Sequence, residues 1–165
     1  PGPGDPGPPP EPLPPVRVRA AADDARLHLL ARLPQVVPGV TAATAEPFVA
    51  TEFRYHGRVD LVTTAGPVRV LVAVSDARTP DPLPCAACTR LPDGSLLAVT
   101  PLTEIGGGGP RVPGQPRYDR WVAHHRPDGS TVLVENEAVR PGELPPLTVE
   151  QLTTLATDPA LLLLR

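Results

Sequence analysis

A turn motif that occurs twice limits the possible folds more than any other part of the sequence. Residues 90–99 read RLPDGSLLAV and residues 126–134 read RPDGSTVLV, so Pro-Asp-Gly-Ser recurs 35 positions further along the chain. Proline sets the φ angle of a tight turn, aspartate can bond to the turn backbone, and glycine adopts left-handed backbone angles at no steric cost. Each copy precedes a run of strand-forming residues. We therefore expect two hairpin tips in one antiparallel sheet, because two short copies are too few to indicate a repeat architecture.

Three segments between residues 47 and 75 also have the pattern of strands. Residues 47–57 and 58–66 each end at a glycine that we expect to form a turn. Residues 68–75 alternate, and one face carries only valine: Val68, Val70, Val72 and Val74. The other face is only partly polar, which indicates a central strand that is covered on both sides.

A helix is expected before the strands, over residues 20–33. Leu29, Leu30 and Leu33 fall on one side. The opposite side carries a polar ladder at i, i+4 spacing, which we expect to be solvated: Asp24, His28 and Arg32. Pro34 is expected to end this helix.

A second helix is expected near the C-terminus, because Thr148 and Gln151 have the spacing of a capping box. Asp158-Pro159 should stop that helix and begin a last turn. The predicted fold class is α+β, with an antiparallel sheet of about six strands and an N-terminal and a C-terminal helix packed on one of its faces.

The N-terminal residues differ in composition from the rest of the chain, since residues 1–15 contain nine prolines. We expect residues 1–16 to be a disordered Pro-rich tether and residues 17–165 to form a single α+β domain. The chain has no methionine and no signal peptide or transmembrane run. We therefore expect a processed form or a piece of a longer protein, whose missing N-terminal part holds a membrane anchor.

The formal net charge of −3 argues against nucleic acid as the partner, because nucleic-acid-binding domains usually carry a basic excess. One stretch places three arginines beside two aromatic residues, and we retain it as a possible binding loop: Arg111, Arg117, Tyr118, Arg120 and Trp121. Arginine beside aromatic rings can clamp an anion or stack on a ring. The alternative is a mobile loop with solvated arginines. The four glycines at 106–109 lead into prolines rather than a helix, so a phosphate-binding loop is not indicated.

Cys85 and Cys88 allow three interpretations: a redox catalyst, half of a zinc site or a disulfide. A redox pair needs a helix after its first cysteine, and here a turn follows within a few residues. A zinc site needs about four ligands, and His124 and His125 point to opposite faces of a predicted strand. A disulfide between Cys85 and Cys88 fits best, and it favours an oxidising compartment.

The segments CAAC (85–88), LPDGS (91–95), RPDGSTVLVENE (126–137) and PPLTVEQLTTLATDP (145–159) together resemble the extracytoplasmic part of certain membrane-anchored proteins and lipoproteins of actinobacteria. The resemblance spans residues 83–159 and rests on turn and helix-cap patterns. It implies an extracytoplasmic location, membrane-anchored or secreted, rather than an activity.

No spacing in the sequence indicates catalytic residues, a metal site or a cofactor. The favoured function is therefore non-enzymatic: an extracytoplasmic domain, sensory or interacting with an unknown protein partner, tethered near the cell envelope. The alternative is a small enzyme or ligand-binding domain that uses the region 106–125.

Overall fold

The computed structural model of the chain describes residues 15–76, 88–105 and 116–163. The elements in chain order are α1 (Pro15–Val36), β1 (Val40–Ala45), β2 (Val49–Ala50), β3 (Arg54–Thr63), β4 (Gly66–Ser75), β5 (Thr89–Arg90), β6 (Leu96–Ile105), β7 (Arg117–His125), β8 (Thr131–Glu137) and α2 (Val149–Ala156). Two helices therefore flank a run of strands, as expected.

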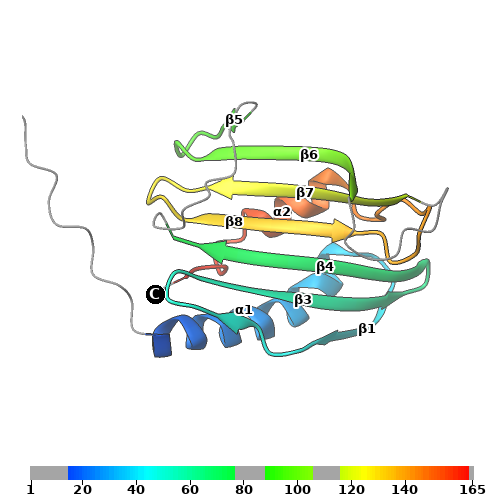
Figure 1. The fold of residues 1–165 in the computed structure, drawn as a ribbon, viewed down its shortest axis with the longest axis horizontal. Helices are drawn as coiled ribbons and strands as arrows, with labels where there is room; N and C mark the ends of the chain where they lie inside the picture. Colours follow the sequence, from blue (N-terminus) through cyan, green and yellow to red (C-terminus); the bar gives the residue numbers. More distant parts are fainter. Residues whose placement is uncertain (1–14, 77–87, 106–115, 164–165) are drawn as a thin grey trace, which may run out of the picture.

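The strands form one antiparallel sheet in the order β1-β3-β4-β8-β7-β6-β5, with β2 paired to β3 beside β1 (Figure 1). The α+β class and the antiparallel sheet are confirmed. The expected number of about six strands is wrong, because the described residues form eight. β1 was not predicted, because its residues VTAATA are rich in alanine, a poor strand former.

The glycine at position 57 lies inside β3 and does not form a turn, contrary to expectation. A Cβ atom placed on Gly57 would lie 2.0 Å from the ring of Phe48, so the aromatic ring occupies the space that a side chain would need. Phe48 also stacks on Tyr55, with ring centroids 6.4 Å apart. The glycine therefore lets an aromatic ring cover the strand, and β3 continues through it.

Both helices cover the same face of the sheet. The valines of β4 expected to share a face are all buried on that side, with between 0% and 4% of their surface exposed: Val68, Val70, Val72 and Val74. They join one core with α1 and α2. Figure 1 looks onto the other face, with α2 visible behind β7 and β8. β4 is central, but its second face has no described helix over it and is only half-buried.

The first helix is longer than expected at both ends. It begins at Pro15, so the last two residues of the expected tether belong to it, and residues 1–14 lie outside the described part of the chain. It continues past Pro34 to Val36, since a proline in the last turn interrupts few helical hydrogen bonds. No helix within residues 15–76, 88–105 and 116–163 is long and apolar enough to cross a membrane.

The two Pro-Asp-Gly-Ser motifs form hairpin tips with the same hydrogen bonds. In the first, the Leu91 amide bonds to the Ser95 carbonyl, and in the second the Arg126 amide bonds to the Ser130 carbonyl. Gly94 and Gly129 have φ angles of 85° and 84°. The turns thus have the structure that the sequence predicted.

The predicted capping box of α2 is also present. The Thr148 hydroxyl accepts from the Gln151 amide, and the Gln151 side chain accepts from the Thr148 amide. Asp158 then accepts from the Ala160 amide, which forms the expected last turn.

Candidate functional site: the open face of the sheet

The sheet face that neither helix covers, called here the open face, carries side chains in register across five strands. One row of directly paired residues runs from β3 to β6: Arg58, Leu71, Glu135, Trp121 and Thr100. The neighbouring row has smaller side chains in its centre: His56, Ala73, Leu133, Ala123 and Ala98. Alternation along each strand places both rows on the same face.

A hollow of about 220 Å³ lies on the open face over β3, β4 and β8. Leu71, Ala73 and Leu133 form its apolar floor, and Glu135 lies at one side. Arg54 and His56 complete the rim. The side chain of Ala73 is small, whereas Leu71 and Glu135 in the first row have larger side chains. The hollow lies over this alanine.

A second hollow, of about 510 Å³, adjoins the first at the sheet edge. It is lined by residues of β1, β2 and β3 and of the turn between the first two: Thr44, Ala45, Glu46, Pro47, Val49, His56, Gly57, Arg58 and Asp60. His56 and Gly57 line both hollows. The two adjoining hollows together are called here the groove, and its lining residues extend from β1 to Glu135 on β8.

Two carboxyl groups meet at the inner end of this groove. Asp119 pairs with Glu137 across β7 and β8, which makes Asp119 and Glu135 diagonal neighbours on one face. Burial raises the pKa of Glu135 to about 7, and the hydrogen bond and negative charge of Asp119 and the charge of Glu137 act in the same direction. One oxygen of Asp119 is buried without a hydrogen-bond partner. The pair therefore holds a proton near neutral pH.

Charged side chains near this pair form salt bridges with one another. Asp60 lies 2.9 Å from the Arg58 Nε and 3.2 Å from the Arg69 Nε. Arg69 also lies 3.9 Å from Glu137. Within the described part of the chain, no arginine or histidine forms a salt bridge with Asp119 or Glu135. The carboxyl pair thus has no cationic partner among the described residues.

The structure separates the residues expected to form a binding loop. Trp121 lies directly opposite Glu135 on the open face and is half-buried, and Arg117 shares that face by alternation. Tyr118 and Arg120 point to the helix side, where Arg120 donates to the Leu147 carbonyl. Arg111 lies outside the described residues. Of the four that the structure describes, Trp121 and Arg117 share the face of the carboxyl pair, and Trp121 lies directly opposite Glu135.

The pairing of the cysteines stays a prediction, since Cys85 lies outside the described residues. Among residues 15–76, 88–105 and 116–163, no group of three His, Cys, Asp or Glu side chains is placed to hold a metal ion. His124 and His125 do lie on opposite faces of β7, as expected from their adjacency.

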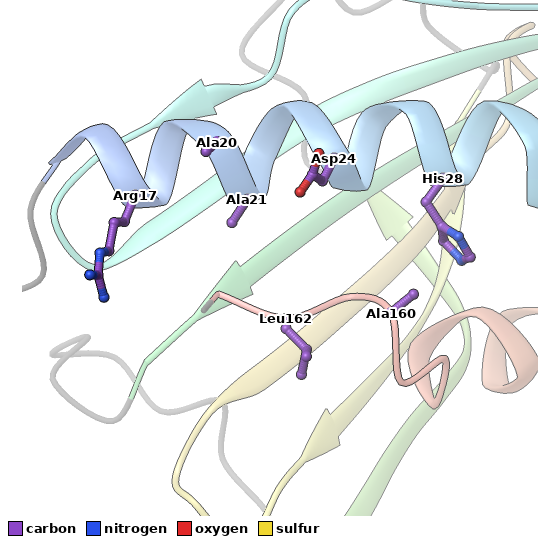
Figure 2. A pocket seen from close by; sticks show the side chains of 7 residues that line it. All are labelled: Arg17, Ala20, Ala21, Asp24, His28, Ala160 and Leu162. Atoms are coloured by element: carbon purple, nitrogen blue, oxygen red, sulfur yellow. The ribbon is translucent and has the colours of Figure 1, made fainter. Parts of the chain in front are cut away.

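A further hollow, of about 270 Å³, lies on the helix side between α1 and the segment after α2 (Figure 2). Arg17, Asp24 and His28 line it on α1, and Ala160 and Leu162 on the other wall. Figure 2 shows His28 reaching from α1 toward Ala160.

Polar contacts beside this hollow hold the C-terminal segment in place. His28 Nε2 lies 2.8 Å from Asp158, and Arg32 Nε lies 3.5 Å from it. Burial acts to raise the pKa of Asp158, but the His28 and Ala160 hydrogen bonds and the Arg32 charge outweigh it and lower the pKa. The expected solvated ladder is therefore wrong for His28 and Arg32, which anchor the C-terminal segment.

Comparison with known proteins adds little. No protein-family model matches the chain, and no curated protein matches it significantly. One solved structure, a STAR-related lipid transfer protein from Xanthomonas axonopodis, is similar at 18% identity over 84% of this chain and 72% of that one, with a TM-score of 0.25. Similarity at this level supports no conclusion about fold or ligand.

Proposed function

We propose that this chain is a non-enzymatic protein-interaction domain that binds an extended segment of a partner protein on its open face. The observation that carries the proposal is the groove formed by the two adjoining hollows, which share His56 and Gly57 and reach the sheet edge at β1. The groove is long, since it crosses from the β1–β2 turn to β8. An elongated depression suits an extended chain better than a compact molecule.

The size and the lining of the inner hollow favour a partner side chain as its occupant. The inner hollow of about 220 Å³ is smaller than ordinary small-molecule sites, which span about 300–1,000 Å³, whereas the outer hollow of about 510 Å³ falls within that range. The inner hollow has an apolar floor with one polar side, as pockets for single anchor residues do.

Selection from a library of random 12-residue peptides tests this function. Peptides enriched on the wild-type domain should lose at least about tenfold in affinity when Ala73→Phe fills the inner hollow, a loss typical of a blocked anchor pocket. Leu27→Phe on the exposed side of α1 is the matched control and should leave binding unchanged. No enrichment, or equal binding by Ala73→Phe, contradicts the proposal.

The location is part of the same proposal. The Pro-rich composition of residues 1–15 and the closeness of Cys85 and Cys88 in sequence support an extracytoplasmic domain on a tether. Mass spectrometry of the protein isolated from its cell should find the two cysteines oxidised. Free thiols at both positions contradict an oxidising compartment.

A second candidate function is supported by the carboxyl pair alone. A carboxyl with a pKa of about 7 beside a second carboxyl is an arrangement that acid–base enzymes use. Turnover of p-nitrophenyl esters or glycosides that Glu135→Gln abolishes, with the melting temperature unchanged, favours this alternative over the binding domain.

A further inference from the structure

The inner end of the groove combines three features that a cationic side chain needs. Asp119 and Glu135 supply two carboxyl groups, one of whose oxygens is buried without a partner. Trp121 lies directly opposite Glu135 and supplies an aromatic ring. The hollow beside Glu135 supplies an apolar floor for the stem of a long side chain.

Several charged side chains near this point form salt bridges with one another. Arg58 and Arg69 bind Asp60, and Arg69 also approaches Glu137. His56 lines the hollow from β3, but it is not in a salt bridge with either carboxyl among the described residues. Arg54 lines the same hollow and Arg117 shares the face of Asp119, but among the described residues neither forms a salt bridge with the carboxyl pair. A cation from a bound partner can therefore complement the pair.

Arginine fits this arrangement better than lysine. Its planar guanidinium presents donors that match two carboxyl oxygens, and its flat face stacks on aromatic rings. It is also more weakly hydrated than an ammonium group, so it enters a half-buried site at lower cost. Trp is the best aromatic partner for a cation.

We propose that the partner segment inserts an arginine side chain between the Asp119–Glu135 carboxyl pair and the indole of Trp121. This proposal rests on the proposed function and names the chemistry of its partner. The guanidinium replaces the proton that the pair holds, and that proton passes to the solvent. Binding therefore takes up one fixed positive charge and releases up to one proton near neutral pH.

The single tryptophan of the chain gives a direct measurement, because its fluorescence reports on this site alone. The probes are the blocked peptide acetyl-Ala-Val-Arg-Val-Ala-amide and the same peptide with citrulline, which has the shape of arginine but no charge. The arginine peptide should change Trp121 emission saturably, and the citrulline peptide should bind at least about tenfold more weakly, as expected for the loss of a charged partner. Equal binding of the two overturns the proposal.

The pH dependence provides a second readout. Since Glu135 must lose its proton, affinity for the arginine peptide should fall about tenfold between pH 8 and pH 6, while arginine itself stays charged throughout. The charged and titratable groups around Glu135 are Asp119 on β7, Glu137 on β8 with Arg69 beyond it, and Arg54 and His56, which line the same hollow from β3. A pH-independent affinity contradicts displacement of the proton.

Variants separate this inference from the proposed function. Glu135→Gln and Asp119→Asn should each weaken the arginine peptide at least about tenfold, and Asp23→Asn on the exposed side of α1 should not. If Glu135→Gln binds as the wild type does while Ala73→Phe blocks binding, the arginine site is wrong and the binding face stands. If Ala73→Phe also binds normally, both fail. Melting temperatures identify any variant that does not fold. If Asp119→Asn does not fold, Glu135→Gln, which mimics the protonated acid, is the variant that tests the arginine site.

Discussion

His28 and Asp158 are 130 positions apart in the sequence and form a hydrogen bond of 2.8 Å between Nε2 and a carboxylate oxygen. Asp158 is only 9% exposed, so its charge depends on this contact and on Arg32. The bond connects α1 to the segment after α2, on the helix side of the sheet.

Replacement of His28 by alanine should lower the free energy of unfolding by about 1–2 kcal/mol, because a buried carboxylate loses a donor. Urea denaturation at pH 7 measures the change, and Arg19→Ala on the exposed side of α1 should be close to neutral. The pKa of Asp158 is lowered in the fold, so its stabilisation is present above its usual value of 3.8 and is lost as pH falls below that value. An equal loss in Arg19→Ala contradicts a specific contact.

Gly57→Ala should destabilise the domain, although alanine adds only one methyl group. Its methyl group meets the Phe48 ring, and overpacking of this kind costs about 1–3 kcal/mol. Combination with Phe48→Leu should cost less than the sum of the single changes, because the two side chains share one space. Additive losses in urea denaturation contradict the packing of Phe48 on Gly57.

Local signals in the sequence were sufficient for the turns and the second helix. The Pro-Asp-Gly-Ser tips and the Thr148–Gln151 capping box depend on residues a few positions apart, so their chemistry is complete within the motif. The same holds for the valine face of β4. Gly57 was wrongly predicted to form a turn. The ring that fills the place of its side chain comes from Phe48, nine positions earlier, and a glycine in a sequence does not indicate such a contact.

The carboxyl pair was missed although a signal for it exists. The second hairpin turn pairs His125 with Thr131, and counting back from the turn places Trp121 opposite Glu135 and Asp119 beside them. Alternation then puts all three on one face. What the sequence could not show is which face the helices cover, since that depends on long-range packing. The role of His28 was inaccessible for the same reason.

The two hairpin turns should respond alike to the same change. Gly94→Ala and Gly129→Ala should each cost about 1 kcal/mol or more, because alanine is strained at a positive φ. Asp93→Asn and Asp128→Asn should be close to neutral, since the amide oxygen can still accept from the serine amides. Thermal unfolding of the four variants measures this. A large loss from either asparagine variant contradicts the expectation that the turn needs only an acceptor oxygen at this position.

His124 should make the domain sensitive to mild acid. It is 6% exposed, and neither ring nitrogen has a hydrogen-bond partner. Burial and then the charge of Arg126 lower its pKa below the usual 6.5. The unfolded chain therefore binds a proton first, and stability falls as pH drops below about 6.5. His124→Leu should show a smaller drop in melting temperature between pH 7 and pH 5 than the wild type, and an unchanged drop contradicts this.

Glu135 should have the opposite effect at higher pH. Its pKa is raised to about 7 in the fold by burial and by Asp119 and Glu137, above the usual 4.5, so the folded state keeps a proton that the unfolded chain loses. The free energy of unfolding of the wild type therefore falls as pH rises from 4.5 through 7, because the folded state must either keep this proton or ionise a buried carboxyl. Glu135→Gln cannot ionise and should melt at a higher temperature than the wild type at pH 8, with little difference at pH 4.

A carboxyl that lowers stability in this way is expected at a binding site, where natural proteins accept such losses. Glu150→Gln, an exposed control on α2, should show no such gain. If Glu135→Gln lowers the melting temperature at pH 8, the carboxylate is a structural group and its place in the binding groove is contradicted.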